Sequence, residues 1–164
     1  MAKQRRSHEQ GHQRKFLVIL DETPECHKAI RFAAERALHT GGMLVFLYVI
    51  PPSEFQHWLG VEDIMRAEAM EAAEAALAAA VDEAKGCATI EPECVIREGT
   101  PSAEIISLIE EDEDIAILVL AAGVSGDGPG PLVTALVQRS SGDFPIPVTI
   151  VPGNMSDQEI DALA

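Results

Sequence analysis

The sequence is poor in aromatic residues and in positive charge. Only 4% of its 164 residues are Phe, Trp or Tyr, and 12 Lys and Arg stand against 27 Asp and Glu. Proteins that bind single-stranded nucleic acids stack bases on repeated aromatic side chains, and binding to nucleic acids or anionic membranes requires clustered cations. A formal net charge of -15 at pH 7 therefore argues against nucleic acids and membrane surfaces as partners.

Cysteine, long apolar runs and phosphate-binding motifs are also scarce. Cys26, Cys87 and Cys94 form no CxxC pair and no cluster with histidine at zinc-ligand spacing, so we predict neither a disulfide framework nor a metal site. Free cysteines fit a reducing, cytoplasmic setting. No apolar run reaches the ~18 residues of a membrane span. The absence of a GxxxxGK[ST] motif, and of GxGxxG after the first apolar run, excludes a phosphate-loop NTPase and the dinucleotide-binding fingerprint.

The charge that is present is unevenly distributed. Residues 1–15 contain five Lys and Arg and one Glu, a net charge of +4, whereas the rest of the chain has seven Lys and Arg against 26 Asp and Glu, a net charge of -19. Short charged termini are commonly disordered. We therefore predict a disordered basic N-terminal arm over residues 1–15, with a contact arm for an acidic partner as the alternative.

Apolar runs alternate with amphipathic segments along the rest of the chain. Thr23-Pro24 predicts the start of the first helix, Gly41-Gly42 its end, and Thr100-Pro101 the start of a later one. A loop with Phe55, His57 and Trp58 precedes a helix over Val61–Lys85 that is stopped by Gly86. Five runs of mostly Val, Ile and Leu predict strands: Phe16–Leu20, Met43–Ile50, Cys94–Ile96, Ile115–Ala122 and Val148–Val151.

This alternation is typical of right-handed βαβ units, which build a parallel sheet with helices on both faces. The predicted fold class is therefore α/β, with one domain over residues 16–153. The polar, acidic residues 154–164 are expected to form a frayed C-terminal tail.

Two features follow predicted strands at their carboxyl ends. Asp21 ends the first strand, and a glycine-rich segment over 123–130 follows the fourth strand. In open parallel α/β sheets, ligands bind outside the carboxyl ends of the strands where the strand order reverses. If the two strands are neighbours, Asp21 and the glycine loop line one crevice, and successive loop N–H groups can bind an anion.

Other candidate groups have plain structural explanations. Cys26 lies in a predicted first helical turn, where the helix dipole can activate a thiol, but Glu22 and Glu25 oppose this and favour a buried structural cysteine. The run Glu110–Asp114 attracts cations or forms a solvated turn. We predict no catalytic residue.

Five segments in this order make the sequence similar to the universal stress protein family. The resemblance covers residues 15–153, and its parts are Phe16-Leu-Val-Ile-Leu-Asp21, Leu47-Tyr-Val49, Arg97-Glu-Gly-Thr-Pro-Ser-Ala-Glu104, Asp114-Ile-Ala-Ile-Leu-Val-Leu-Ala121 and Pro145-Ile-Pro-Val148. It implies a Rossmann-like fold, of the adenine nucleotide alpha hydrolase type, with a five-stranded parallel sheet of order 3-2-1-4-5. It also implies homodimers joined through the fifth strand, and ATP or AMP as a ligand of some members.

The resemblance also implies a nucleotide site. In ATP-binding members the signature G-x2-G-x9-G-[S/T] follows the fourth strand. Gly123 and Gly126 match its first half and would lie beside ribose and phosphates, with Asp21 and Val49 near adenine. The second half is absent, because Leu136-Val137 occupies its place and Gly130 is the nearest substitute.

Two features of the loop oppose phosphate binding where the second half of the signature is missing. Pro129 and Pro131 remove two N–H donors from the loop, and Asp127 adds a carboxylate where phosphates would arrive. Gly128, with the neighbouring glycines, keeps the loop adaptable.

Three hypotheses follow from the sequence. The first is a non-catalytic regulatory or stress-response module; the second is an adenine-nucleotide binder with at most slow ATP hydrolysis. The third is a dimeric interaction protein whose basic arm contacts an acidic partner.

Overall fold

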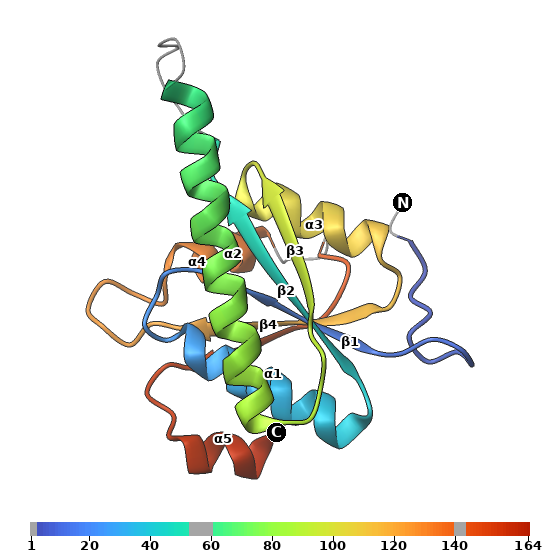
Figure 1. Cartoon of the computed structure of the whole chain (residues 1–164). Coiled ribbons are helices and arrows are strands. Elements are labelled where there is room, and N and C mark those ends of the chain that lie inside the picture. The colour runs from blue at the N-terminus through green and yellow to red at the C-terminus, as the bar shows by residue number, and fades with distance from the viewer. Residues whose placement is uncertain (1–2, 53–60, 140–143) are drawn as a thin grey trace.

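The protein folds into five strands and five helices within the residues described by its structure, a computed structural model covering 3–52, 61–139 and 144–164 (Figure 1). The predicted loop with Phe55, His57 and Trp58 lies outside these residues. The elements follow one another as β1 (Lys15–Ile19), α1 (Cys26–Thr40), β2 (Met43–Ile50), α2 (Val61–Cys87), β3 (Glu93–Glu98), α3 (Pro101–Glu111), β4 (Ile115–Ala122), α4 (Pro131–Arg139), β5 (Val148–Pro152) and α5 (Asp157–Leu163).

The strands form one parallel sheet of order β3-β2-β1-β4-β5, which confirms the predicted fold class. β1 lies at its centre, where Leu17 is in register with Val45 of β2 and with Leu118 of β4. The chain reverses its direction of winding between β1 and β4. The carboxyl ends of these two strands therefore bring Asp21 and Gly123 to the same edge of the sheet.

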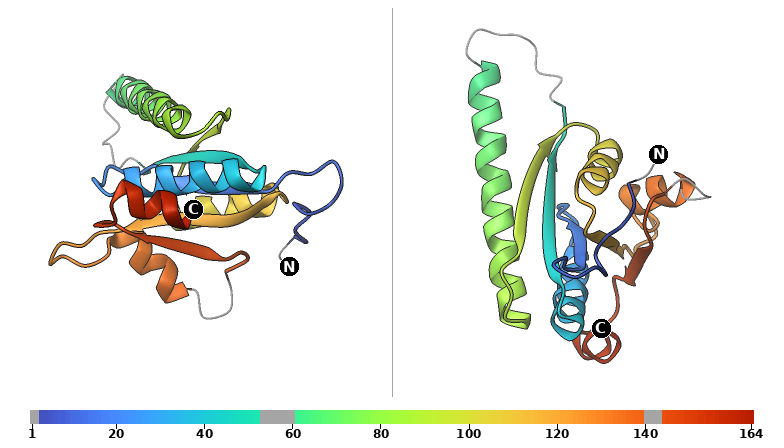
Figure 2. Two further views of the ribbon diagram at one scale, coloured as in Figure 1. Left: turned by 90° about the horizontal axis from the view of Figure 1, so that it is seen from below. Right: turned by 90° about the vertical axis from the view of Figure 1, so that its right-hand side faces the viewer.

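Alternating side chains of β1 enter two separate cores. Phe16 and Val18 point to the face covered by α1, α2 and α5, whereas Leu17 and Ile19 point to the face covered by α3 and α4 (Figure 2). All four are at most 6% exposed, so the strand is buried on both faces. A continuous apolar run without polar alternation is the sequence pattern that such double burial requires.

Two predicted helix boundaries are shifted by local hydrogen bonds or packing. Helix α1 begins at Cys26 with Glu25 as N-cap, because Thr23 is held by Asp21: the Thr23 backbone N–H and hydroxyl both donate to Asp21 Oδ1, the former over 3.2 Å. Such side-chain turns compete with helix initiation. Helix α2 continues through Gly86 to Cys87.

The C-terminal residues form helix α5, so the prediction of a frayed tail is wrong. Ser156 Oγ accepts a hydrogen bond from the Glu159 N–H (3.2 Å), and Glu159 Oε2 accepts one from the Ser156 N–H (2.8 Å). This capping box starts the helix. Ile160 is completely buried, and Asp161 pairs with Arg31 of α1 at 2.7 Å. The sequence contains the signal for this capping box, Ser-x-x-Glu, within a polar and acidic composition that is also typical of disordered termini.

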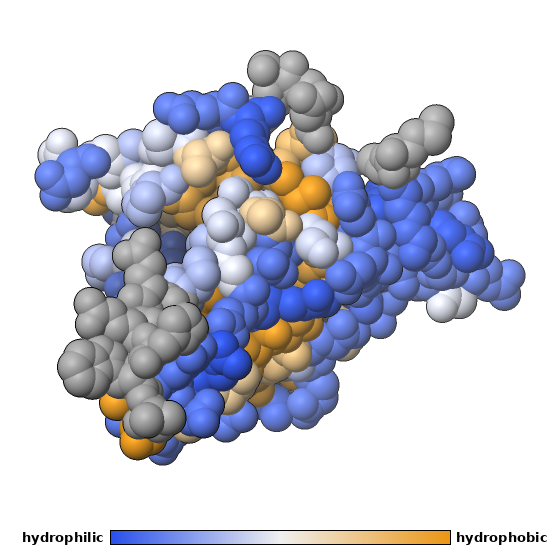
Figure 3. All heavy atoms as spheres, turned by 90° about the horizontal axis from the view of Figure 1, so that it is seen from above, coloured by the Kyte–Doolittle hydropathy of each residue, from blue (hydrophilic) through white to orange (hydrophobic). Residues whose placement is uncertain are grey.

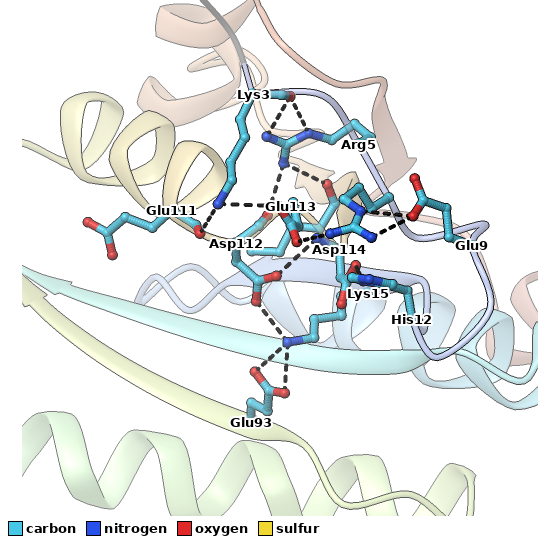
Figure 4. A network of polar contacts seen from close by, with 12 residues as sticks. Lys3, Arg5, Glu9, His12, Lys15, Glu93, Glu111, Asp112, Glu113 and Asp114 are labelled. Atoms are coloured by element: carbon cyan, nitrogen blue, oxygen red, sulfur yellow. Dashed lines mark hydrogen bonds and ion pairs between the residues drawn. The ribbon is translucent and has the colours of Figure 1, made fainter.

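The N-terminal arm is likewise bound to the domain rather than disordered over residues 3–14. Arg5 Nη1 donates to three backbone carbonyls at the end of α3 and the start of β4, those of Ile109 (2.6 Å), Asp112 (2.9 Å) and Ile115 (3.2 Å) (Figure 4). The last carbonyls of a helix lack intrahelical partners and carry partial negative charge. A guanidinium group satisfies both deficits at once.

Ion pairs hold the arm along the same acidic segment. Arg6 lies 3.5 Å from Glu113, His12 Nδ1 lies 2.7 Å from Asp114 Oδ1, and the Arg6 N–H donates to the Glu113 carbonyl over 3.1 Å (Figure 4). The acidic run at the end of α3 is therefore an attachment site for the chain's own basic arm. Lys3, Arg5, Arg6 and Lys15 are engaged within the chain, which leaves them less available to an acidic partner.

We predict that Arg5→Ala lowers the free energy of unfolding by about 1.5–3 kcal/mol, the usual contribution of hydrogen bonds to a charged group. Chemical denaturation measures the change. The matched control is Arg14→Ala, which removes the same charge from an exposed position of the arm. Equal losses in the two variants would show that the carbonyl contacts contribute nothing.

Candidate functional site

An open cleft of about 500 Å³ lies at the carboxyl ends of β1 and β2. The first residues of α3 and α4 form its other side. Figure 3, which looks onto the ends of β2 and β3, shows apolar side chains exposed among polar ones on this side of the molecule. The described residues that line the cleft are Ile19, Leu20, Asp21, Glu22, Thr23, Tyr48, Val49, Pro51, Thr100, Pro101, Ser102, Pro131, Leu132 and Ala135.

The structure brings two of the predicted site residues together in this cleft. Asp21 follows β1 directly and Val49 lies near the end of β2; because these strands are adjacent and parallel, both residues reach the same edge of the sheet. The Asp21 carboxylate is oriented by its hydrogen bonds from Thr23. One of its oxygens thus has a fixed direction beside an apolar wall. Their contact with a ligand remains a prediction.

The crevice directly between β1 and β4 is almost filled. Its cavity measures about 10 Å³, space for a single water at most, and is bordered by Cys26, Leu120 and Leu132. The Cys26 thiol donates to the Ile19 carbonyl over 3.6 Å, and burial raises the pKa of this thiol to about 12. A thiol with this pKa stays protonated at neutral pH, as expected for a structural cysteine.

The glycine loop after β4 does not contribute to the lining of the large cleft. Its N–H groups are partly used inside the loop: Gly123 donates to the Pro129 carbonyl over 3.0 Å and Gly128 to the Ser125 carbonyl over 3.2 Å. The segment is exposed and projects from the body of the domain (orange in Figure 1). Of the predicted glycines, Gly126, Gly128 and Gly130 are thus not brought to Asp21 and Val49.

The conformation of the loop itself accounts for several of its glycines. Gly128 and Gly130 have φ angles of 89° and 108°, a region that other residues rarely adopt. At Gly123 a side chain would lie 3.1 Å from the Gly128 carbonyl oxygen and 3.0 Å from a carboxylate oxygen of Glu25. The close approach of Glu25 puts a negative charge where the resemblance implied ribose and phosphates.

Sequence reasoning missed the two helix starts that complete the cleft. Thr100 is the N-cap of α3 without a side-chain cap, Pro101 is its first residue, and Pro131 begins α4. The free N–H groups of a helix's first turn attract anionic groups. Thr100-Pro101 predicts the start of α3. Because helices in a parallel α/β sheet begin after the carboxyl ends of strands, this signal also places the start of α3 at the edge of the sheet where the cleft lies.

The electrostatic character of the cleft is negative. Its described lining includes the carboxylates of Asp21 and Glu22 and no Lys, Arg or His. The three ranges that the structure describes contain no cluster of three or more His, Cys, Asp or Glu suited to a metal ion. None of their helices is long and apolar enough to cross a membrane.

Solved structures of known proteins share this fold. A universal stress protein UspA from Lactobacillus plantarum superposes with a TM-score of 0.68 at 18% identity, covering 85% of this chain and 97% of that one. A universal stress protein in complex with cAMP gives 0.62 at 20% identity, covering 85% and 97%. One from Archaeoglobus fulgidus in complex with dAMP gives 0.58 at 19% identity, covering 85% and 98%.

Sequence comparison identifies the family. No curated protein sequence matches this chain significantly. The family model described as "Universal stress protein family", however, matches residues 13–152, which is most of the chain and includes all five strands. The chain therefore belongs to the universal stress protein family.

Proposed function

We propose that this protein is a non-catalytic, cytoplasmic regulatory module that takes an adenine nucleoside or nucleoside monophosphate in the cleft at the ends of β1 and β2. The single observation that carries the proposal is the apolar cleft of about 500 Å³ with the fixed carboxylate of Asp21 at its wall. This volume falls within the range of small-molecule sites.

The cleft suits a flat heterocycle better than a purely polar ligand. Val49, Tyr48 and Leu132 offer apolar surface for a ring face, and Asp21 offers a hydrogen-bond acceptor. Adenine presents an exocyclic amino group and ribose presents hydroxyls, both of which donate to a carboxylate. A few oriented polar groups on an apolar wall are the usual means by which such sites select a ligand.

The charge around the cleft favours few phosphates. Asp21 and Glu22 line it, Glu25 lies beside Gly123, and no described lining residue is a cation. Each close pair of like charges costs about 1 kcal/mol even in water, so three phosphates are opposed more strongly than one. The starts of α3 and α4 can stabilise a single phosphate. The two universal stress proteins solved with a nucleotide are in complex with cAMP and dAMP, each of which contains one phosphate.

The same charge distribution supports a non-catalytic role. Enzymes that transfer phosphoryl groups neutralise the charge of the transition state with lysine, arginine or a held metal ion. The described lining residues include no such cation and no histidine that would serve as a base. Binding without turnover fits a module that reports on a ligand to a partner.

We predict that adenosine and AMP bind more tightly than ATP, by at least tenfold at low ionic strength, and that Asp21→Ala weakens the binding of adenosine. Isothermal titration calorimetry at 20 mM and 500 mM NaCl tests both points. Salt should narrow the gap between AMP and ATP, since screening weakens repulsion. Asp63→Ala, which removes an exposed carboxylate of α2, is the matched control. Tighter binding of ATP, or binding that ignores Asp21, would contradict the proposal.

We further propose that the protein is a homodimer joined through β5. This strand is an edge of the sheet, and its Ile150 side chain is 39% exposed. An exposed aliphatic edge strand promotes association unless another chain covers it. A groove of about 330 Å³ beside it is lined by apolar residues of β4, α4, β5 and the segment before β5, including Phe144 and Val148.

Ile150→Lys is expected to convert the dimer to a monomer, because it places a charge in an apolar contact. Multi-angle light scattering gives the molar mass directly. Leu163→Lys serves as the control, since this leucine is 62% exposed and belongs to α5, which packs on α1. A dimer that survives Ile150→Lys, or one lost equally in the control, rules out this interface.

A further inference from the structure

A second groove runs between helix α2 and strand β3. This strand forms one edge of the sheet, and β5 forms the other. Helix α2 packs on α1 and β2, so its face toward β3 stays open. Figure 2 shows α2 and β3 side by side at the outside of the molecule. The groove measures about 530 Å³ and is lined by Glu74, Leu77, Ala78, Val81, Asp82, Cys94 and Ile96.

One stripe of α2 and one face of β3 build the groove. The helix residues occupy positions i, i+3, i+4, i+7 and i+8, which places them on a single face; they are Glu74, Leu77, Ala78, Val81 and Asp82. On β3, Cys94 and Ile96 point toward α2, whereas Val95 packs into the core on the other side of the sheet. The floor of the groove is therefore apolar.

The outer edge of β3 offers hydrogen bonds to a further strand. The Gly99 N–H donates to the Ile50 carbonyl of β2 over 2.9 Å, and backbone groups alternate in direction along a strand. The N–H and C=O groups of Cys94, Ile96 and Glu98 consequently point away from β2. Among the described residues, no strand pairs with this edge.

The rim of the groove is acidic. Glu74 and Asp82 form no ion pair with the described residues, whereas the ion pairs Arg66–Glu98 (3.7 Å) and Lys85–Glu91 (3.0 Å) mark its two ends. A second copy of this chain would bring the same carboxylates to the contact and be repelled. Charge complementarity therefore selects a basic occupant.

We propose that this groove binds an extended segment of a partner protein, which adds to β3 as a sixth strand and carries a basic, an aliphatic and a basic residue at alternate positions. Eight residues of helix separate Glu74 from Asp82, about 12 Å along the axis. Residues i and i+4 of a strand are about 13 Å apart. Two cations at i and i+4 thus reach the two carboxylates, and the aliphatic side chain at i+2 packs on Leu77, Val81 and Ile96.

This binding mode is β-strand addition, in which backbone hydrogen bonds supply affinity and alternate side chains supply selectivity. It requires nothing from the nucleotide cleft and stands independently of the function proposed above. The partner motif is Lys or Arg, any residue, Val, Ile or Leu, any residue, and Lys or Arg.

The test uses a fluorescein-labelled peptide, Gly-Lys-Thr-Val-Thr-Lys-Gly, titrated with the full-length protein in a fluorescence anisotropy assay. We expect saturable binding that Glu74→Lys/Asp82→Lys weakens at least tenfold. The control variant Glu68→Lys/Glu110→Lys makes the same change in net charge at exposed positions outside the groove and should bind as the parent does. Circular dichroism verifies that both variants fold.

Two further peptides separate strand addition from simple attraction of charges. N-methylation of the two threonines and the valine removes backbone donors while keeping every charge, and should abolish binding. A peptide with the order scrambled to place both lysines together should bind at least tenfold more weakly. Equal binding of the N-methylated peptide, equal binding by both double variants, or no binding of the parent peptide at millimolar protein would each overturn the proposal.

A structural readout accompanies the affinities. In NMR titrations, the amide signals of Cys94, Ile96 and Glu98 should shift more than those of the buried strand β1. Shifts confined to other surfaces would overturn the assignment to this groove.

Discussion

The rest of the structure depends on the burial of β1 between β2 and β4. Phe16 and Val18 enter one core and Leu17 and Ile19 the other, so a single short strand ties both helical layers together. Its hydrogen bonds to β2 and β4 also fix where the sheet reverses its winding. That reversal sets the position of Asp21, and the neighbouring end of β2 adds Val49. The candidate site thus follows from the placement of one buried strand.

Electrostatics shapes what the fold can bind. A domain with a net charge of -19 uses the basic arm to neutralise one part of itself, the acidic end of α3, where Arg5 also binds two carbonyls at the end of the helix and one at the start of β4. The same arm leaves the cleft at the ends of β1 and β2 and the α2–β3 groove without added cations. Both surfaces are apolar with acidic borders, so they favour ligands with little negative charge or with positive charge.

The strands were predictable because each contains a short apolar run, which the three central strands β1, β2 and β4 bury, and the predicted boundaries agree with the structure to within two residues. Asp21 and Val49 could be placed because parallel strands end together. The position of the glycine loop could not be predicted, since hydrogen bonds such as that from Gly123 to Pro129 depend on the conformation of the whole loop. The order of the arm and of the tail was not predictable from composition, because it depends on contacts with distant residues. Arg5 binds backbone carbonyls of α3, and Ile160 is buried in the core.

By itself, the sequence determined the α/β class, the five strands and the acidity. Hydrophobic periodicity is a property of short local segments, and net charge is a sum over the residues of the chain. Only the tertiary structure decided that the crevice beside β4 is filled while the cleft beside β2 is open, and that the two termini bind to the domain. These outcomes depend on which side chains meet across the sheet. Contacts between residues far apart in the chain, such as Arg5 with Ile109, are set by packing and leave no periodic signal in the sequence.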